Sequence, residues 1–128
     1  MMIPYNSVEE PAAPPAPFMD AEIRNPVLMI SERMKAKLDT GAALTTIPSE
    51  LVERLQLQPV GERTFRGYDG QPTTREIFFV NMDLNGNKFE MVMATSASRN
   101  NILIGRNILN QLEIELHGKD LAFEVRDP

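Results

Sequence analysis

Several residue types that build catalytic or structural sites are scarce in this sequence. Cys is absent from the 128 residues, and His117 is the only His. The absence of Cys excludes disulfides, cysteine nucleophiles and thiolate metal sites. A single His cannot supply a multi-histidine zinc site, and its place before Gly118 is typical of a solvated turn residue. We therefore expect no bound metal and no cofactor.

Long apolar runs and an excess of positive charge are also missing. No apolar stretch approaches the roughly 18 residues that a membrane-spanning helix needs. Residues 1–6 lack the basic and apolar regions of a signal peptide, so a cytoplasmic protein without a membrane partner is expected. The formal net charge is −5. Nucleic acid is not expected as a main partner, because neutralising phosphates requires a basic surface.

Proline divides the chain into two parts. Six of the ten prolines lie in residues 1–26, in a Pro/Ala-rich stretch. Because proline fixes φ and lacks an N–H donor, regular sheet pairing or a continuous helix is not expected there. We predict that residues 1–26 are a flexible head or a removable pro-segment. Residues 27–128 are predicted to form one domain, since their number suits a single hydrophobic core.

Alternation of apolar and polar residues dominates this second part. Met34, Ala36 and Leu38 point to one side of a strand, and Lys35 and Lys37 point to the other. The same pattern predicts further strands at residues 60–65, 74–84, 88–94, 101–104, 112–116 and 121–125. Apolar residues at helical spacing predict short helices at residues 48–55 and 106–112. The sequence thus predicts an all-β fold with one or two short α-helices.

An acid at the end of a buried strand needs an explanation. Asp39 follows the apolar strand directly, and Thr40, Gly41 and Ala42 come after it. Asp is depleted within strands. Gly41 allows a sharp turn and leaves room for another backbone or a ligand. Taken alone, however, Asp-x-Gly is most typical of an ordinary turn.

A second segment changes the interpretation of the Asp39 segment. Residues 101–109 form an apolar strand that ends at a glycine and continues at once into a short helix. Together the two segments resemble the retropepsin family, the dimeric aspartic proteases of retroviruses and their cellular and bacterial relatives. The first family motif is Asp-Thr/Ser-Gly-Ala, and the second is an apolar pair followed by Gly-Arg-Asn/Asp. The matching residues here are Asp39, Thr40, Gly41 and Ala42, then Ile104, Gly105, Arg106 and Asn107.

This resemblance covers residues 27–125 and implies a closed β fold that is active as a symmetric homodimer. It also implies an endopeptidase that acts on a peptide or protein substrate. Hydrolysis without a metal or covalent nucleophile needs an activated water and an acid, and two adjacent carboxylates that share one proton supply both. The chain contains a single Asp-Thr-Gly, so Asp39 must come from each of two subunits.

The resemblance assigns further roles to particular residues. Thr40 would bond its counterpart across the two-fold axis, and Gly41 would line the cleft. Viral members often carry an acid where Ala43 stands, so Arg106 is expected to bind a backbone carbonyl or another acid instead. Ala43 and Leu44 favour hydrophobic side chains beside the cleaved bond. A hairpin tip is predicted to be either a flap that contacts substrate or a plain surface turn, and its residues are Gly67, Tyr68, Asp69, Gly70 and Gln71.

Other interpretations remain open at this point. The dimer could be catalytically idle and act as a peptide-binding or assembly module, and Asp39 could belong to an ordinary β-turn. Residues 121–125 could pair with their copy in a dimer or form an edge strand within the chain. Self-cleavage is a further hypothesis, and the apolar pairs Phe18-Met19 and Leu28-Met29 are its candidate sites.

Overall fold

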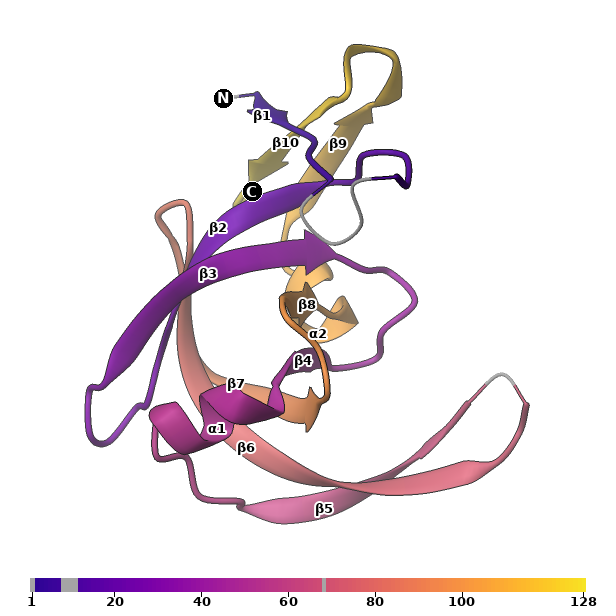
Figure 1. Cartoon of the computed structure of the whole chain (residues 1–128). Coiled ribbons are helices and arrows are strands. Elements are labelled where there is room, and N and C mark those ends of the chain that lie inside the picture. Colours follow the sequence, from indigo (N-terminus) through magenta and orange to yellow (C-terminus); the bar gives the residue numbers. More distant parts are fainter. Residues whose placement is uncertain (1, 8–11, 68) are drawn as a thin grey trace.

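The computed structural model describes residues 2–7, 12–67 and 69–128, and its centre is a closed β barrel. Neighbouring strands follow the order β2-β3-β8-β4-β7-β6, and an antiparallel pairing of β2 with β6 closes the ring (Figure 1). The strands are β2 (Phe18–Arg24), β3 (Ser31–Leu38), β8 (Ile102–Ile104), β4 (Thr45–Pro48), β7 (Asn87–Ala97) and β6 (Pro72–Leu84). The predicted all-β closed fold is confirmed.

Two short α-helices interrupt the strands, as the sequence predicts. Helix α1 (Ser49–Arg54) follows β4 and buries Leu51 in the core. Pro48 precedes it as the N-cap residue, with a φ of −58° and an extended ψ of 137°, so the helix begins at Ser49. Helix α2 (Arg106–Leu109) follows β8 and is shorter than expected. No helix in the described ranges has the length and apolar character that crossing a membrane requires.

The longest strand shows how the alternating pattern fills the barrel. Phe78, Val80, Met82 and Leu84 of β6 are all buried, at 3% exposure or less. Each inward side chain is two residues from the next, because successive residues in a strand face opposite sides. Asn85 and Gly86 then adopt positive φ values of 52° and 91°, which suit a tight hairpin turn into β7. The strands predicted at residues 74–84 and 88–94 are confirmed.

Strand β2 corrects the predicted domain boundary. The sequence analysis placed residues 18–24 in a flexible head, but they pair with β3 along their whole length and with β6 at their end. Four of their side chains, Phe18, Met19, Ala21 and Ile23, are at most 2% exposed. The error came from the prolines, which flank this strand at residues 17 and 26 and do not interrupt it. Burial of Phe18-Met19 also removes that pair as a cleavage site in the folded chain.

A separate three-stranded sheet joins the two ends of the chain. Strand β10 (Ala122–Arg126) lies between β1 (Ile3–Pro4) and β9 (Glu113–His117), and the 3₁₀ helix η1 (Gly118–Asp120) links β9 to β10. The ring of Tyr5 packs on Phe123 at 5.9 Å between centroids. Strand β10 is therefore the middle strand of this sheet and not an edge strand, although β1 covers only Ala122 and Phe123. Pairing of residues 121–125 with their copy in a dimer stays a prediction.

Candidate active site

Asp39 stands where the barrel strand β3 ends. Strands β3 and β8 run parallel, and their pairing aligns Leu38 with Ile104. The Asp39 N–H donates to the Ile104 carbonyl at 3.0 Å, so the ladder continues to the acid itself. The chain then turns back, and the Ala42 N–H donates to the Asp39 carbonyl at 3.2 Å. These backbone bonds place a half-buried carboxylate at the start of a tight loop.

The loop also orients the carboxylate. The Gly41 N–H donates to Asp39 Oδ1 at 2.9 Å. A Cβ atom added at Gly41 would lie only 3.1 Å from that same oxygen, so any larger residue would push against the acid. Within the described residues the second oxygen, Oδ2, has no hydrogen-bond partner. One face of the carboxylate is thus held by the backbone, and the other is available to a water or to another group.

Gly105 lets the second motif approach this loop closely. A Cβ atom there would lie 2.3 Å from the Leu44 carbonyl carbon, which is well inside van der Waals contact. The Gly105 N–H donates to Thr45 Oγ1 at 3.2 Å, and the Arg106 N–H donates to the Ala42 carbonyl at 2.9 Å. The start of α2 therefore packs backbone to backbone against the segment after Asp39. Only glycine has the size that this contact requires.

The side chain of Asn107 forms hydrogen bonds with the segment after Asp39 and with β7. Its Oδ1 accepts hydrogen bonds from the N–H and the hydroxyl of Thr45, both at 3.0 Å. Its Nδ2 donates to the Met93 carbonyl of β7 at 2.8 Å. The sequence analysis missed Thr45 and Met93 as partners. Thr45 is fully buried, so its polar groups must find hydrogen-bond partners, but this burial is visible only in the structure.

The structure shows what Arg106 binds in place of the acid that viral members carry at the position of Ala43. Its Nη1 donates to the Thr40 carbonyl at 2.9 Å, so the guanidinium binds a backbone carbonyl of the Asp39 loop. This confirms one of the two expected arrangements. Thr40 itself is exposed at the outer end of the loop. Two residues of the second motif, Ile104 and Arg106, thus bond the first motif directly. The other two, Gly105 and Asn107, bond Thr45 in the segment that follows it.

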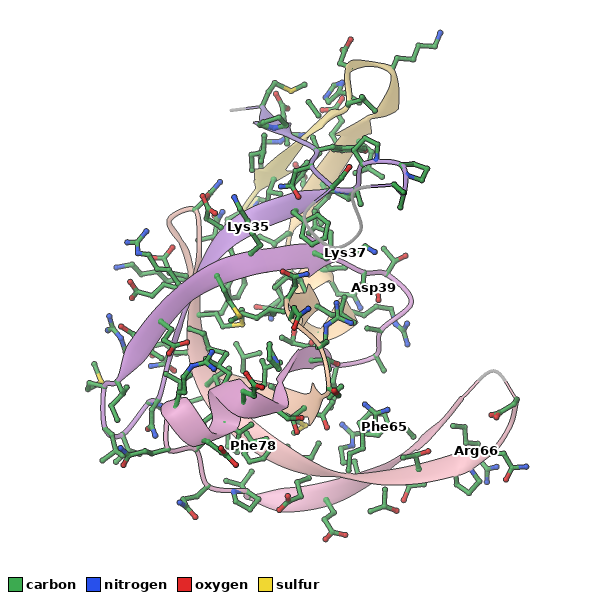
Figure 2. All side chains as sticks on the ribbon, viewed as in Figure 1. Lys35, Lys37, Asp39, Phe65, Arg66 and Phe78 are labelled. Carbon is green, nitrogen blue, oxygen red and sulfur yellow. The ribbon has the colours of Figure 1, made fainter. Side chains whose placement is uncertain are left out.

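A hairpin faces the loop from across a cleft. Strand β5 (Gly61–Arg66) pairs with the first half of β6, from Gly61↔Ile77 to Arg66↔Pro72. It projects from the barrel, and Figure 2 shows Asp39 on the loop after β3 and Phe65 on the hairpin opposite. The cleft between the hairpin and the loop residues that follow Asp39 has a volume of about 340 Å³, and Asp39 itself lies just outside its lining. Its lining comprises Gly41, Ala42, Ala43, Leu44, Thr46, Phe65, Arg66, Gly67, Thr73, Arg75, Thr95 and Arg106.

The tip of this hairpin contains the residues predicted as flap contacts. Gly67 lines the cleft, whereas Asp69, Gly70 and Gln71 are exposed and do not line it. The Gly70 N–H donates to the Gly67 carbonyl at 2.9 Å, and Gly70 has a φ of 78° that suits glycine. Asp69 Oδ1 accepts from the Gln71 N–H at 3.0 Å. The fifth predicted residue, Tyr68, lies outside the described residues.

A group of metal-type side chains lies elsewhere, on the three-stranded sheet. Glu115, His117 and Glu124 place their ligand atoms within 4.8 Å of one another. Arg126 already binds both carboxylates, at 2.6 Å to Glu124 and 3.5 Å to Glu115. The hydrogen bond that Arg126 donates to Glu124 raises the pKa of Arg126, so the guanidinium stays charged. His117 ends β9 with its side chain 32% exposed, so its prediction as a solvated turn residue is wrong.

A closed barrel that presents Asp-Thr-Gly, held by Gly-Arg-Asn, defines the retropepsin-like class of aspartic proteases. The family described as "gag-polyprotein putative aspartyl protease" matches residues 26–123, and the chain belongs to this family. No curated relative matches the sequence.

Solved structures agree with this assignment at the level of the fold. A retropepsin-like aspartic protease from Rickettsia conorii is 16% identical and superposes with a TM-score of 0.61, covering 98% of this chain and 90% of its own. The simian foamy virus protease is 19% identical with a TM-score of 0.55, over 73% and 92% of the two chains. The EIAV protease, in complex with an inhibitor, is 18% identical with a TM-score of 0.55, over 74% and 86%.

Proposed function

We propose that the protein is an aspartic endopeptidase that hydrolyses peptide bonds as a homodimer. Two Asp39 carboxylates, one from each subunit, would hold and activate the attacking water. The observation that carries this proposal is the state of Asp39. Its carboxylate is fixed on one side by the Gly41 N–H, is unbonded on the other within the described chain, and lies next to the residues that line the cleft.

The need for a second subunit follows from a count of acids. The mechanism requires two carboxylates in contact, yet the described cleft lining contains no Asp or Glu. Asp69 lies at the hairpin tip, and Asp83 accepts a hydrogen bond from the Gly86 N–H in a distant turn. A second copy of Asp39 supplies the missing acid if the loops of two subunits meet at a two-fold axis. The exposed position of Thr40 leaves it available for that contact.

The chemistry divides between the two carboxylates. When two such groups touch, repulsion keeps one protonated while the other is ionised. The ionised Asp39 takes a proton from water, and the water oxygen attacks the carbonyl carbon of the peptide. The neutral Asp39 donates its proton to the carbonyl oxygen. The Asp39 that took the proton from water then gives it to the amine nitrogen as the C–N bond breaks. The other Asp39 recovers a proton from a hydroxyl of the intermediate, which becomes the carboxylic acid product. No metal or covalent intermediate is needed.

The β5–β6 hairpin would act as the flap. Phe65 and Thr73 lie directly opposite each other on the face that lines the cleft, so they are placed to contact a bound peptide. Closure of such a hairpin excludes water and strengthens the hydrogen bonds made to the substrate. Gly67 and Gly70 at the tip permit the backbone changes that closure requires.

The test is cleavage of a denatured protein mixture from about pH 4 to 7, a range that brackets the titration of a carboxylate pair. Wild type should cut, and Asp39→Asn should not cut while it keeps the same fold and sedimentation. Asp83→Asn is the matched control, because its amide oxygen still accepts the Gly86 N–H, and it should cut like wild type. A generic aspartic-protease inhibitor should bind wild type and lose affinity for Asp39→Asn.

Two results would contradict the proposal. A stable dimer that cuts nothing at any pH would identify the protein as a peptide-binding or assembly module. A chain that stays monomeric at high concentration would remove the second carboxylate, and Asp39 would then be an ordinary turn residue.

A further inference from the structure

The cleft beside Asp39 differs in charge from the rest of the molecule. The chain has a net charge of −5, with 18 acidic and 13 basic residues. Yet three arginines line the cleft, Arg66, Arg75 and Arg106, and no acid does so within the described lining. A concave site with one sign of charge focuses its potential and attracts ligands of the opposite sign.

Among the described residues, none of these three arginines forms an ion pair with an acid. Elsewhere, Arg24, Arg54 and Arg126 each form ion pairs with glutamates. In the cleft, Arg66 donates to the Gly70 carbonyl at 3.2 Å and Arg106 to the Thr40 carbonyl at 2.9 Å. Backbone carbonyls satisfy donors but leave the positive charge uncompensated.

Arg75 is the most available of the three. Its guanidinium has no hydrogen bond or ion pair to any residue that the structure describes. In the hairpin register it lies directly opposite Arg63, and like charges in this arrangement repel across the strands. Arg63 turns toward β7, where Nη1 lies 3.5 Å from Met93 Sδ. A bound anion at Arg75 would relieve the repulsion that the fold leaves in place.

The inner part of the same cleft is apolar. Ala42, Ala43 and Leu44 line it next to the Asp39 loop, and Phe65 lines it from the hairpin. Arg75 lies on the face of the hairpin that carries Phe65 and Thr73, two residues further from the tip than Thr73. A peptide in the cleft would therefore meet apolar walls beside the Asp39 loop and the charge of Arg75 farther along the hairpin.

We propose that the protein selects peptides in which an apolar pair is flanked by acidic residues, and that Arg75 is a specificity-determining residue. Each carboxylate side chain of the peptide would form a charge-assisted hydrogen bond with a guanidinium of the cleft. In a symmetric dimer both halves of the cleft carry Arg75, so acidic residues on either side of the cut are recognised. This inference rests on the proposed protease function.

The experiment compares two synthetic peptides that differ only in Glu or Gln on both sides of a Phe-Leu pair. At low salt and about pH 6, where Glu is ionised, we expect wild type to favour the Glu peptide about tenfold in kcat/KM. The preference should shrink with added salt and fall to about twofold in Arg75→Gln. Arg33→Gln is the matched control, because it removes the same charge at a residue that does not line the cleft. The Arg33 side chain is 82% exposed on β3.

Binding of the same peptides to Asp39→Asn separates this inference from the proposed function. If wild type cuts neither peptide, the protease proposal fails, and the affinities of the two peptides for Asp39→Asn still measure the charge preference. Equal cleavage and equal binding of the Glu and Gln peptides would overturn the inference. So would an equal loss in Arg33→Gln and Arg75→Gln, since the effect would then be general electrostatics. If a single-stranded oligonucleotide displaces the Glu peptide by binding at Arg75, the cleft would be a nucleic-acid site. That result would overturn the inference as well.

Discussion

Replacement of Gly105 by alanine tests the packing that holds the Asp39 loop. The added methyl carbon would lie 2.3 Å from the Leu44 carbonyl carbon and 2.6 Å from the Thr45 nitrogen. Carbon atoms in contact are normally about 3.5 to 4.0 Å apart. Because the contacted atoms are backbone, no side-chain rotation can relieve the clash. Helix α2 and the segment after Ala42 must move apart by about 1 Å or more.

The cost of this movement can be worked from the contacts it breaks. Forced overpacking usually costs about 1 to 3 kcal/mol. The separation also lengthens the hydrogen bonds from the Gly105 N–H to Thr45 Oγ1 and from the Arg106 N–H to the Ala42 carbonyl. Each contributes about 1 kcal/mol net. We expect Gly105→Ala to lower the free energy of unfolding by about 3 kcal/mol, and Tm by roughly 10 °C.

Urea denaturation followed by far-UV circular dichroism measures this change, at one fixed protein concentration because dimerisation would shift the apparent stability. Gly61→Ala is the matched control. A Cβ atom at Gly61 meets nothing within 4 Å, so we expect a neutral effect or a gain of about 0.5 kcal/mol from reduced freedom of the unfolded chain. If Gly105→Ala unfolds within about 0.5 kcal/mol of wild type, the argument from backbone contact is refuted.

Three further predictions concern other parts of the fold. Deletion of residues 1–26 should abolish cooperative unfolding, because each fully buried side chain of β2 contributes about 1.5 to 3 kcal/mol; a truncated chain with native circular dichroism would contradict this. Asn107→Ala should lose about 2 to 4 kcal/mol in denaturation, since it removes three hydrogen bonds and leaves a buried N–H unpaired, whereas Asn110→Ala at an exposed position should change little. The hydrogen bond from Arg54 lowers the pKa of Glu32, so the pair stabilises the fold above the ordinary pKa of a glutamate, and that stability is lost as pH falls through the lowered value. Glu32→Gln should therefore be slightly less stable than wild type at about pH 7 and equal to it at about pH 2 or below, and a difference that persists in acid would show another cause.

Local patterns predicted the parts of the site that depend on neighbouring residues. The alternation in residues 33–38 identified β3, and the acid at its end marked the loop of Asp39. Gly105 was singled out because it separates an apolar strand from a helix, and the structure shows the close backbone contact that requires it. These features could be predicted because they depend on φ, ψ and side-chain direction within a few residues.

Other features depend on partners far along the chain. The Arg106 guanidinium reaches Thr40 across 66 positions of sequence, and Asn107 reaches Thr45 across 62. Sequence reasoning named Arg106 but left its partner open, and it did not identify Thr45. Arg75 is one exposed arginine among 13 basic residues, and nothing near it in the sequence places it in the cleft. Only the register of β5 with β6 brings it to the face that carries Phe65.

The sequence by itself determined an all-β chain with two short helices, one Asp-Thr-Gly loop and a second motif that belongs with it. The tertiary structure alone decided that residues 18–24 complete the barrel, where Ala21 pairs with Leu84, and that β1 shares a sheet with β10. The physical reason is the range of the forces involved. Backbone sterics and side-chain alternation act locally and are visible in any short segment. Barrel closure is decided by which distant strands bury each other's apolar faces and backbone N–H groups, and that choice belongs to the whole chain.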